Sequence, residues 1–322
     1  MTTDSLADCL PPEMRGLDRA IAITKLAKGM SGAGVYRVDA GGQAYVLKVA
    51  SDSEPAADWQ GALTIQQLAA GAEIAPRIVH VDEQRRAVLT ALVADRSFGR
   101  FYGDPRSHLA AVVMLGQTVR RIHALAIPAD APRRDPRAFL GQIAGAVPPA
   151  GFALPAFVLQ AIEKMLAESP PAVERPPVLS HNDLNPSNLI YDGQSIQILD
   201  WAAAGISDPH YDLAVLAVFL GMNQDTCLRL LSAYDATRVT AIPAGFTYLR
   251  RLAGTLAGTA GLHNARLLGH PGSDADTLDS ALPLGAFYQQ MMTGRLKLGT
   301  PEGNWAFGLS LIKGSLAVEA QR

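Results

Sequence analysis

Residues 180–188 are Ser-His-Asn-Asp-Leu-Asn-Pro-Ser-Asn, and this stretch decides how the rest of the chain is interpreted. His181, Asp183 and Asn188 follow the spacing H-x-D-x-x-x-x-N. A carboxylate can accept a proton, and an amide oxygen five residues later can bind a hard cation. Asp183 taken alone is equally well explained as the cap of a turn, so the interpretation depends on the neighbouring segments.

An apolar strand that ends in an acid follows shortly after this stretch. Residues 196–201 are Ile-Gln-Ile-Leu-Asp-Trp, which places a second carboxylate at Asp200. Magnesium takes oxygen ligands, usually one or two carboxylates together with substrate phosphates, so Asn188 and Asp200 are the predicted metal ligands. The combination is typical of kinase catalytic loops, in which positioning and charge neutralisation carry phosphoryl transfer. Asp183 is then the predicted catalytic base.

The nucleotide half of the site is expected upstream, in residues 28–36, Lys-Gly-Met-Ser-Gly-Ala-Gly-Val-Tyr. Backbone N–H groups of a glycine-rich hairpin can approach phosphates closely. Lys48 lies inside the next apolar strand, where an ammonium is costly without a partner such as the phosphates of ATP. Adenine would be held by backbone groups where the sheet ends, in residues 91–94. The predicted cofactor is ATP with Mg²⁺, and its predicted contacts are Ser31, Gly32, Gly34, Lys48, Ala91 and Val93.

The periodicity of apolar residues changes at about residue 93. Before it, strands are expected at 20–26, 35–38, 45–49, 78–81 and 88–93, with a helix at 58–70. After it, helices are expected at 109–125, 156–167 and over most of the chain from 211, with two short strands at 188–191 and 196–199. The predicted fold class is α+β. The predicted domains are a β-rich nucleotide-binding lobe, 1–92, and a mainly helical catalytic and acceptor-binding lobe, 93–322.

These segments together resemble the aminoglycoside phosphotransferase and choline kinase superfamily, which has a protein-kinase-like two-lobe fold. The resemblance covers roughly residues 20–220. It rests on GMSGAGVYRV (29–38), LKV (47–49), LGQTVRRIHAL (115–125), HNDLNPSNLI (181–190), ILDWAAAG (198–205) and DPHYDLA (208–214). It implies an ATP-dependent kinase that acts on a hydroxyl of a small molecule, with an amine-bearing alcohol of the aminoglycoside type as the first choice. It also implies that Asp212 braces the catalytic loop, that His181 orients the loop backbone and that His123 is structural.

The chain departs from the superfamily pattern in two places. The superfamily has a glutamate on the first helix that pairs with the lysine, whereas here the nearest acids are Glu54, Asp58 and Glu73. The residue that meets Lys48 therefore stays open. Choline kinases tend to carry a glutamate soon after the metal-binding aspartate, and residues 202–204 are alanines here. A standard choline site is disfavoured on this ground.

Composition excludes several other classes of function. The formal net charge is −2, so no basic excess exists to neutralise a nucleic acid. Cys9 and Cys227 are far apart, which disfavours a disulfide framework or a zinc site. Neither an apolar leader at the amino terminus nor a membrane-spanning run is apparent, so we expect a cytoplasmic enzyme with no membrane partner.

Three alternatives remain beside the first interpretation. A protein kinase would carry arginine after the histidine and a long activation segment, but Asn182 stands there and Asp212 follows Asp200 too soon. A choline, ethanolamine or other metabolite kinase would share the same reaction with a different acceptor. A pseudokinase would bind nucleotide without turnover, and the missing helix glutamate is the feature that favours it. The sequence identifies neither the acceptor nor the oligomeric state.

Overall fold

The computed structural model describes residues 6–15, 21–26, 33–146, 152–172 and 175–319. The strands are β1 (Ala22–Lys25), β2 (Gly34–Ala40), β3 (Gln43–Val49), β4 (Ile78–Asp82), β5 (Ala87–Ala91), β6 (Val178–Ser180), β7 (Leu189–Tyr191), β8 (Ile196–Ile198) and β9 (Gly205–Ser207). The helices are α2 (Pro12–Arg15), α3 (Ala56–Gly71), α4 (Phe98–Gly103), α5 (His108–His123), α6 (Pro136–Ala146), α7 (Ala156–Ala167), α8 (Pro209–Phe219), α9 (Gln224–Asp235), α10 (Ala244–Leu267), α11 (Leu284–Met292) and α12 (Pro301–Glu319). Single 3₁₀ turns lie at η1 (Pro186–Asn188) and η2 (Trp201–Ala203).

The amino-terminal part is an antiparallel sheet in the order β1-β2-β3-β5-β4. Gly41 and Gly42 join β2 to β3, with φ of 60° and 79°. Two successive positive φ values match a type I′ turn, whose twist suits a two-residue hairpin. This hairpin fixes the register that pairs Val35 with Lys48.

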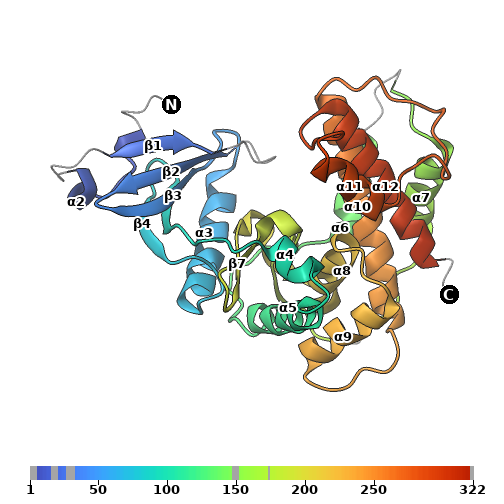
Figure 1. Cartoon of the computed structure of the whole chain (residues 1–322), viewed down its shortest axis with the longest axis horizontal. Coiled ribbons are helices and arrows are strands. Elements are labelled where there is room, and N and C mark those ends of the chain that lie inside the picture. The colour runs from blue at the N-terminus through green and yellow to red at the C-terminus, as the bar shows by residue number, and fades with distance from the viewer. Residues whose placement is uncertain (1–5, 16–20, 27–32, 147–151, 173–174, 320–322) are drawn as a thin grey trace.

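Both faces of this sheet are covered. Because side chains alternate along a strand, Leu47 lies on one face and Lys48 on the other. Leu47 packs with Leu6 and Leu10 of the amino-terminal segment, while α3 covers the opposite face through Trp59. Figure 1 shows the sheet at one end of the molecule and α3 between it and the helical part. Lys48 is thereby directed toward the helical part rather than toward solvent beyond the sheet.

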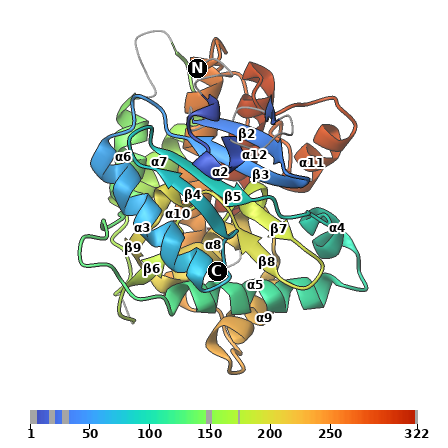
Figure 2. The same cartoon turned by 90° about the vertical axis from the view of Figure 1, so that its left-hand side faces the viewer.

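The carboxy-terminal part is built mainly from helices around one large apolar core. This core joins α5, α8, α9 and α10 to the small sheets β6–β9 and β7–β8. In Figure 2, α5 lies between the β7–β8 hairpin and α9. Among the helices of the described chain, none is both long and apolar enough to cross a membrane.

Helices α10 and α12 approach one another through glycines. A Cβ on Gly258 would lie 2.8 Å from the carbonyl oxygen of Gly308, and a Cβ on Gly308 would lie 2.8 Å from that of Gly258. Such distances are shorter than real Cβ contacts, so the two backbones touch where the helices cross. In Figure 1 the two helices lie in the part of the molecule opposite the sheet.

The predicted α+β fold class is confirmed, with a β-rich amino-terminal part and a mainly helical remainder. The predicted strands and the helices at 58–70, 109–125 and 156–167 all occur, with ends shifted by a few residues at most. The sequence interpretation missed α2, α4 and α6. It also missed the two-stranded sheet of β6 and β9, whose three-residue strands are too short to show a periodic pattern.

Candidate functional site

The backbone of the catalytic loop is held by a buried carboxylate at the start of α8. Asp212 Oδ2 accepts the N–H of His181 at 2.9 Å, and Asp212 Oδ1 accepts that of Asn182 at 2.7 Å. Burial alone would raise the pKa of Asp212, but hydrogen bonds from His123 and from the loop outweigh it and lower the pKa. Asp212 is thus an anion with 0 % exposure, and it braces the loop as the superfamily resemblance implied.

His123 supports this carboxylate from the end of α5. Its Nε2 lies 3.0 Å from Asp212 Oδ2, and its Nδ1 lies 2.9 Å from the Tyr234 hydroxyl. Burial raises the pKa of Tyr234 to about 12, so the phenol keeps its proton near neutral pH. The arrangement assigns a proton to Nε2, which donates to Asp212. This fits the structural role expected for His123.

His181 and Asn182 orient the loop itself. Asp183 N–H donates to His181 Nδ1 at 3.2 Å, so Nε2 carries the ring proton and donates to the Leu199 carbonyl at 2.9 Å. Asn182 has φ of 64°, a left-handed conformation that asparagine tolerates better than most residues. Its side-chain amide donates to the carbonyls of Ser180, Ala203 and Gly205. The loop is therefore tied to the segment that carries Asp200.

Asp183 projects from this loop between two amides. Asn185 Nδ2 donates to its Oδ1 at 2.9 Å, and Asn188 Nδ2 donates to its Oδ2 at 3.0 Å. Burial raises the pKa of Asp183, the amide bonds lower it, and the negative charge of Asp200 raises it; the net shift is upward. A carboxylate with a raised pKa accepts a proton more readily than a solvated one.

Lys48 and Asp200 join the two parts of the molecule. Lys48 Nζ lies 2.6 Å from Asp200 Oδ1, so β3 of the sheet meets the segment after β8. Burial alone would raise the pKa of Asp200, but the charge and hydrogen bond of Lys48 lower it. Asp200 has φ of 56°, and this left-handed conformation turns the chain directly into η2.

The remaining predicted nucleotide contacts are placed less completely. Ser31 and Gly32 lie outside the described residues, and Gly34 begins β2 opposite Val49. Ala91 ends β5, and its N–H donates to Arg77, while the N–H of Leu92 donates to Ala44. Among the described residues, no acceptor is bonded to the N–H of Val93. The same holds for the N–H of Ala94, so Val93 and Ala94 are the donors in this segment that a ligand can use.

The oxygen atoms around Asp183 suit a magnesium ion. The amide nitrogen of Asn188 is bonded to the carbonyl and carboxylate of Asp183, which leaves the amide oxygen for a cation. Asp200 supplies a carboxylate with a lowered pKa. The described residues hold no cluster of three or more histidines, cysteines, aspartates or glutamates that would form a metal site by themselves. One carboxylate and one amide fit a metal that completes its shell with phosphates and water.

Sequence reasoning missed two contributors to this geometry. Asn185 orients Asp183 and also caps η1 by accepting the N–H of Ser187. An asparagine directly before Pro186 is a typical cap, and this pattern would have identified it. Asn182 was noted only as a departure from protein kinases. Its requirement for a left-handed backbone cannot be seen in the sequence.

The fold and this geometry define a two-lobed phosphotransferase of the protein-kinase-like class. The model of the phosphotransferase enzyme family matches residues 22–267. This match covers more than half of the chain, which therefore belongs to that family and is a phosphotransferase enzyme. A comparison with curated proteins finds no match.

Solved structures show the same fold at low sequence identity. A choline/ethanolamine kinase family protein from Mesorhizobium loti is 19% identical with a TM-score of 0.62, over 97% of this chain and 99% of that one. A choline kinase from Streptococcus pneumoniae is 14% identical with a TM-score of 0.62, over 94% of each chain. A spectinomycin phosphotransferase, solved with ADP and spectinomycin, is 12% identical with a TM-score of 0.61, over 92% of this chain and 93% of that one.

Proposed function

We propose that this enzyme transfers the γ-phosphate of ATP to a hydroxyl group of a small molecule. The observation that carries the proposal is the convergence of Asp183, Asn188, Asp200 and Lys48 from three separate elements. Phosphoryl transfer requires a base, a metal site and a cation beside the phosphates in fixed relative positions. These four side chains supply each of them.

Asp183 would take the proton of the acceptor hydroxyl. Its two amide partners, Asn185 and Asn188, hold the carboxylate in one orientation. Burial raises the pKa of Asp183, which increases the basicity of its carboxylate. The proton would move to whichever carboxylate oxygen faces the acceptor.

Magnesium would supply positive charge to the phosphate oxygens while they are transferred. Asn188 and Asp200 would hold it through their side-chain oxygens. Lys48 and the backbone from Ser31 through Gly34 would bind the phosphates, and backbone groups of Ala91 and Val93 would bind adenine. On this basis residues 1–92 form the nucleotide lobe and residues 93–322 the catalytic and acceptor lobe.

A small acceptor is favoured over a protein because the segment between Asp200 and α8 is already folded into short elements of secondary structure. It forms η2 and then β9, which pairs with β6. Such an arrangement provides no peptide-binding activation segment of the kind that protein kinases use. We also place the reaction in the cytoplasm, where ATP and magnesium are available.

The preferred acceptor is an amine-bearing alcohol of the aminoglycoside type. The similarity to a spectinomycin phosphotransferase, solved in complex with ADP and spectinomycin, supports this choice. Choline or ethanolamine is the second candidate, because two similar structures bear the names of kinases for these alcohols. Residues 202–204 are alanines and offer no acid to a choline headgroup, which favours the first candidate.

The test is a measurement of ADP release with ATP, magnesium and a panel of acceptors. The panel contains aminoglycosides, choline, ethanolamine, thiamine, sugars and macrolides, with Asp183→Asn as the inactive control. Turnover on an amine-bearing alcohol supports the proposal. ATP binding without turnover on any acceptor would identify a pseudokinase, and efficient phosphorylation of a protein would contradict a small-molecule acceptor.

A further inference from the structure

Lys48 has a single anionic partner in the described structure, and that partner has another task. Its Nζ lies 2.6 Å from Asp200 Oδ1. An ammonium carries three N–H donors, and a carboxylate engaged by a divalent cation holds a lysine less strongly. If Asp200 binds the metal ion, the phosphates can take some of the donors of Lys48. A further acid is then needed to keep the Lys48 ammonium in place beside the phosphates.

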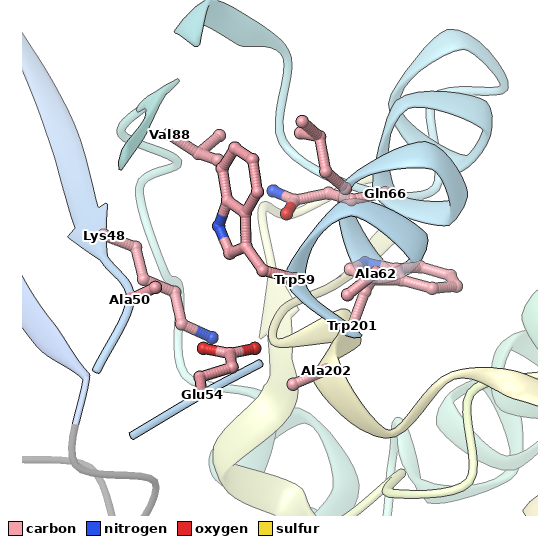
Figure 3. A pocket seen from close by; sticks show the side chains of 10 residues that line it. Lys48, Ala50, Glu54, Trp59, Ala62, Gln66, Val88, Trp201 and Ala202 are labelled. Atoms are coloured by element: carbon pink, nitrogen blue, oxygen red, sulfur yellow. The ribbon is translucent and has the colours of Figure 1, made fainter. Parts of the chain in front are cut away.

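Helix α3 does not provide this acid. It faces Lys48 across a small pocket with three apolar side chains, Trp59, Ala62 and Leu63, and with Gln66. The amide of Gln66 has no net charge and cannot balance an ammonium. Figure 3 shows Gln66 and Trp59 on the α3 side of this pocket, opposite the strand that carries Lys48.

Glu54 is the acid among the residues that line this pocket, and it comes from the segment that leads into α3. Figure 3 shows its carboxylate directed toward the Lys48 ammonium. Glu54 is half-buried, and within the described chain its carboxylate forms no salt bridge. Its carboxylate is therefore available to pair with the Lys48 ammonium.

Hydrogen bonds hold the backbone at Glu54, which fixes the position from which its side chain extends. Its N–H donates to the Ser51 carbonyl at 3.0 Å, and its own carbonyl accepts a guanidinium N–H of Arg86. The carbonyl of Arg86 in turn accepts the N–H of Ala50. These bonds attach the segment to the β4–β5 turn of the sheet, beside the strand that carries Lys48.

We propose that Glu54 is a positioning residue that holds the Lys48 ammonium once Asp200 is engaged by the metal ion. Lys48 then exchanges one acid for another when nucleotide and metal bind together. Glu54 would thereby replace the helix glutamate that the chain lacks. This inference rests on the proposed function, because it requires that Asp200 binds the metal and that Lys48 meets the phosphates.

The test is the affinity for ADP, measured by isothermal titration calorimetry with and without magnesium. Glu54→Gln should weaken binding of ADP with magnesium by about tenfold, the effect of losing one charge-assisted hydrogen bond. Binding of ADP without the metal should change by less than about twofold, because Asp200 still holds Lys48 there. The matched control is Asp58→Asn, which removes an exposed acid from the first turn of α3. It should leave both affinities within about twofold.

A rescue variant separates positioning from folding. The double substitution Glu54→Gln with Gln66→Glu moves the acid to the helix side of the same pocket, and it should restore most of the magnesium-dependent affinity. Loss of binding by Glu54→Gln in both conditions would overturn the exchange of partners, because metal-free binding should not depend on Glu54. Failure of the double variant to recover magnesium-dependent affinity would overturn the positioning role. Wild-type affinity of Glu54→Gln in both conditions would overturn this inference alone. A wild-type protein that binds no nucleotide would overturn the proposed function as well.

Discussion

Two carboxylates flank the site, and the regions around them differ in how they are held. Asp212 is 0 % exposed and receives two backbone N–H groups of the catalytic loop together with the His123 imidazole. Asp200 has a side chain that is 35% exposed and one cation, Lys48, as its partner. Both oxygens of the Asp212 carboxylate are bonded within the protein, whereas the partly exposed carboxylate of Asp200 can still take a ligand.

This difference indicates a division of labour within the site. The loop that carries Asp183 is already assembled without substrates, so no reorganisation is needed when the acceptor arrives. In the function we propose, the region between the sheet and Asp200 would change partners when nucleotide and metal bind. Substitutions in these two regions should therefore have effects on activity and stability that differ in kind as well as in size.

The largest expected effect is the loss of the base. Asp183→Asn should lower the rate of transfer by about 10²- to 10⁴-fold, a typical contribution of general-base catalysis. Affinity for ATP should change little, because the proposed role of this carboxylate concerns the acceptor hydroxyl and not the nucleotide. Steady-state kinetics checks the rate and calorimetry checks the affinity. A variant with the wild-type rate would show that another group is the base.

The pH dependence of the wild-type enzyme provides the control for this assignment. Asp183 must be ionised to accept a proton, and its pKa lies above the usual 3.8 of aspartate. The value of kcat/KM should therefore fall toward acid pH, with an apparent pKa higher than that of an exposed aspartate. An acid limb at or below the ordinary value would contradict the raised pKa.

At the proposed metal site, Asp200→Ala should impair magnesium binding more severely than Asn188→Ala. A carboxylate gives the metal a full charge, whereas an amide gives it a dipole. We expect Asp200→Ala to raise the magnesium concentration for half-maximal rate by about 100-fold and Asn188→Ala by about tenfold. Activity is measured over a magnesium titration at saturating ATP. Wild-type curves for both variants would place the metal elsewhere.

In the region of the catalytic loop that Asp212 braces, Asp212→Asn should lower the stability of the protein as well as the rate of transfer. The substitution leaves a buried N–H of the loop without a charged acceptor, at a cost of about 2–5 kcal/mol in the free energy of unfolding. Chemical denaturation measures this cost. Asp208→Asn is the matched control at the cap of the same helix, where asparagine serves nearly as well as aspartate. Equal losses in both variants would show that Asp212 acts only as part of the helix start.

The smallest expected difference concerns the left-handed backbone at Asn182. Asn182→Gly keeps this conformation accessible and loses the amide bonds, whereas Asn182→Ala loses both. The alanine variant should therefore be less stable than the glycine variant by about 1 kcal/mol. Denaturation of the two variants side by side makes the comparison. If alanine were the more stable, backbone strain at this position would not matter.

The sequence predicted the parts of the molecule that have long periodic patterns or a fixed motif spacing. Alternation in residues 45–49 and the apolar stripe from 109 to 125 were sufficient for β3 and α5. The H-x-D-x-x-x-x-N spacing placed Asp183 beside Asn188, because five residues with a 3₁₀ turn return the chain on itself. The relative position of these two side chains therefore depends on residues that are close to them in the sequence.

What the sequence could not predict depends on contacts across long separations. Lys48 and Asp200 are 152 positions apart, so their ion pair follows from how the two parts pack. The covering of the sheet by Leu6 and Leu10 is another such contact, because the segment that holds them has little pattern of its own. Asp200 was assigned to the metal alone, and its bond to Lys48 was not foreseen.

The crossing of α10 and α12 at Gly258 and Gly308 limits how this enzyme can diversify. With backbones in contact, the distance between the two helices is already at its minimum, and any larger residue at either glycine must push them apart. No substitution at these two positions can therefore tighten the crossing further. Adjustments to this part of the molecule would have to come from side chains on the exposed faces of the two helices, while the crossing itself stays fixed.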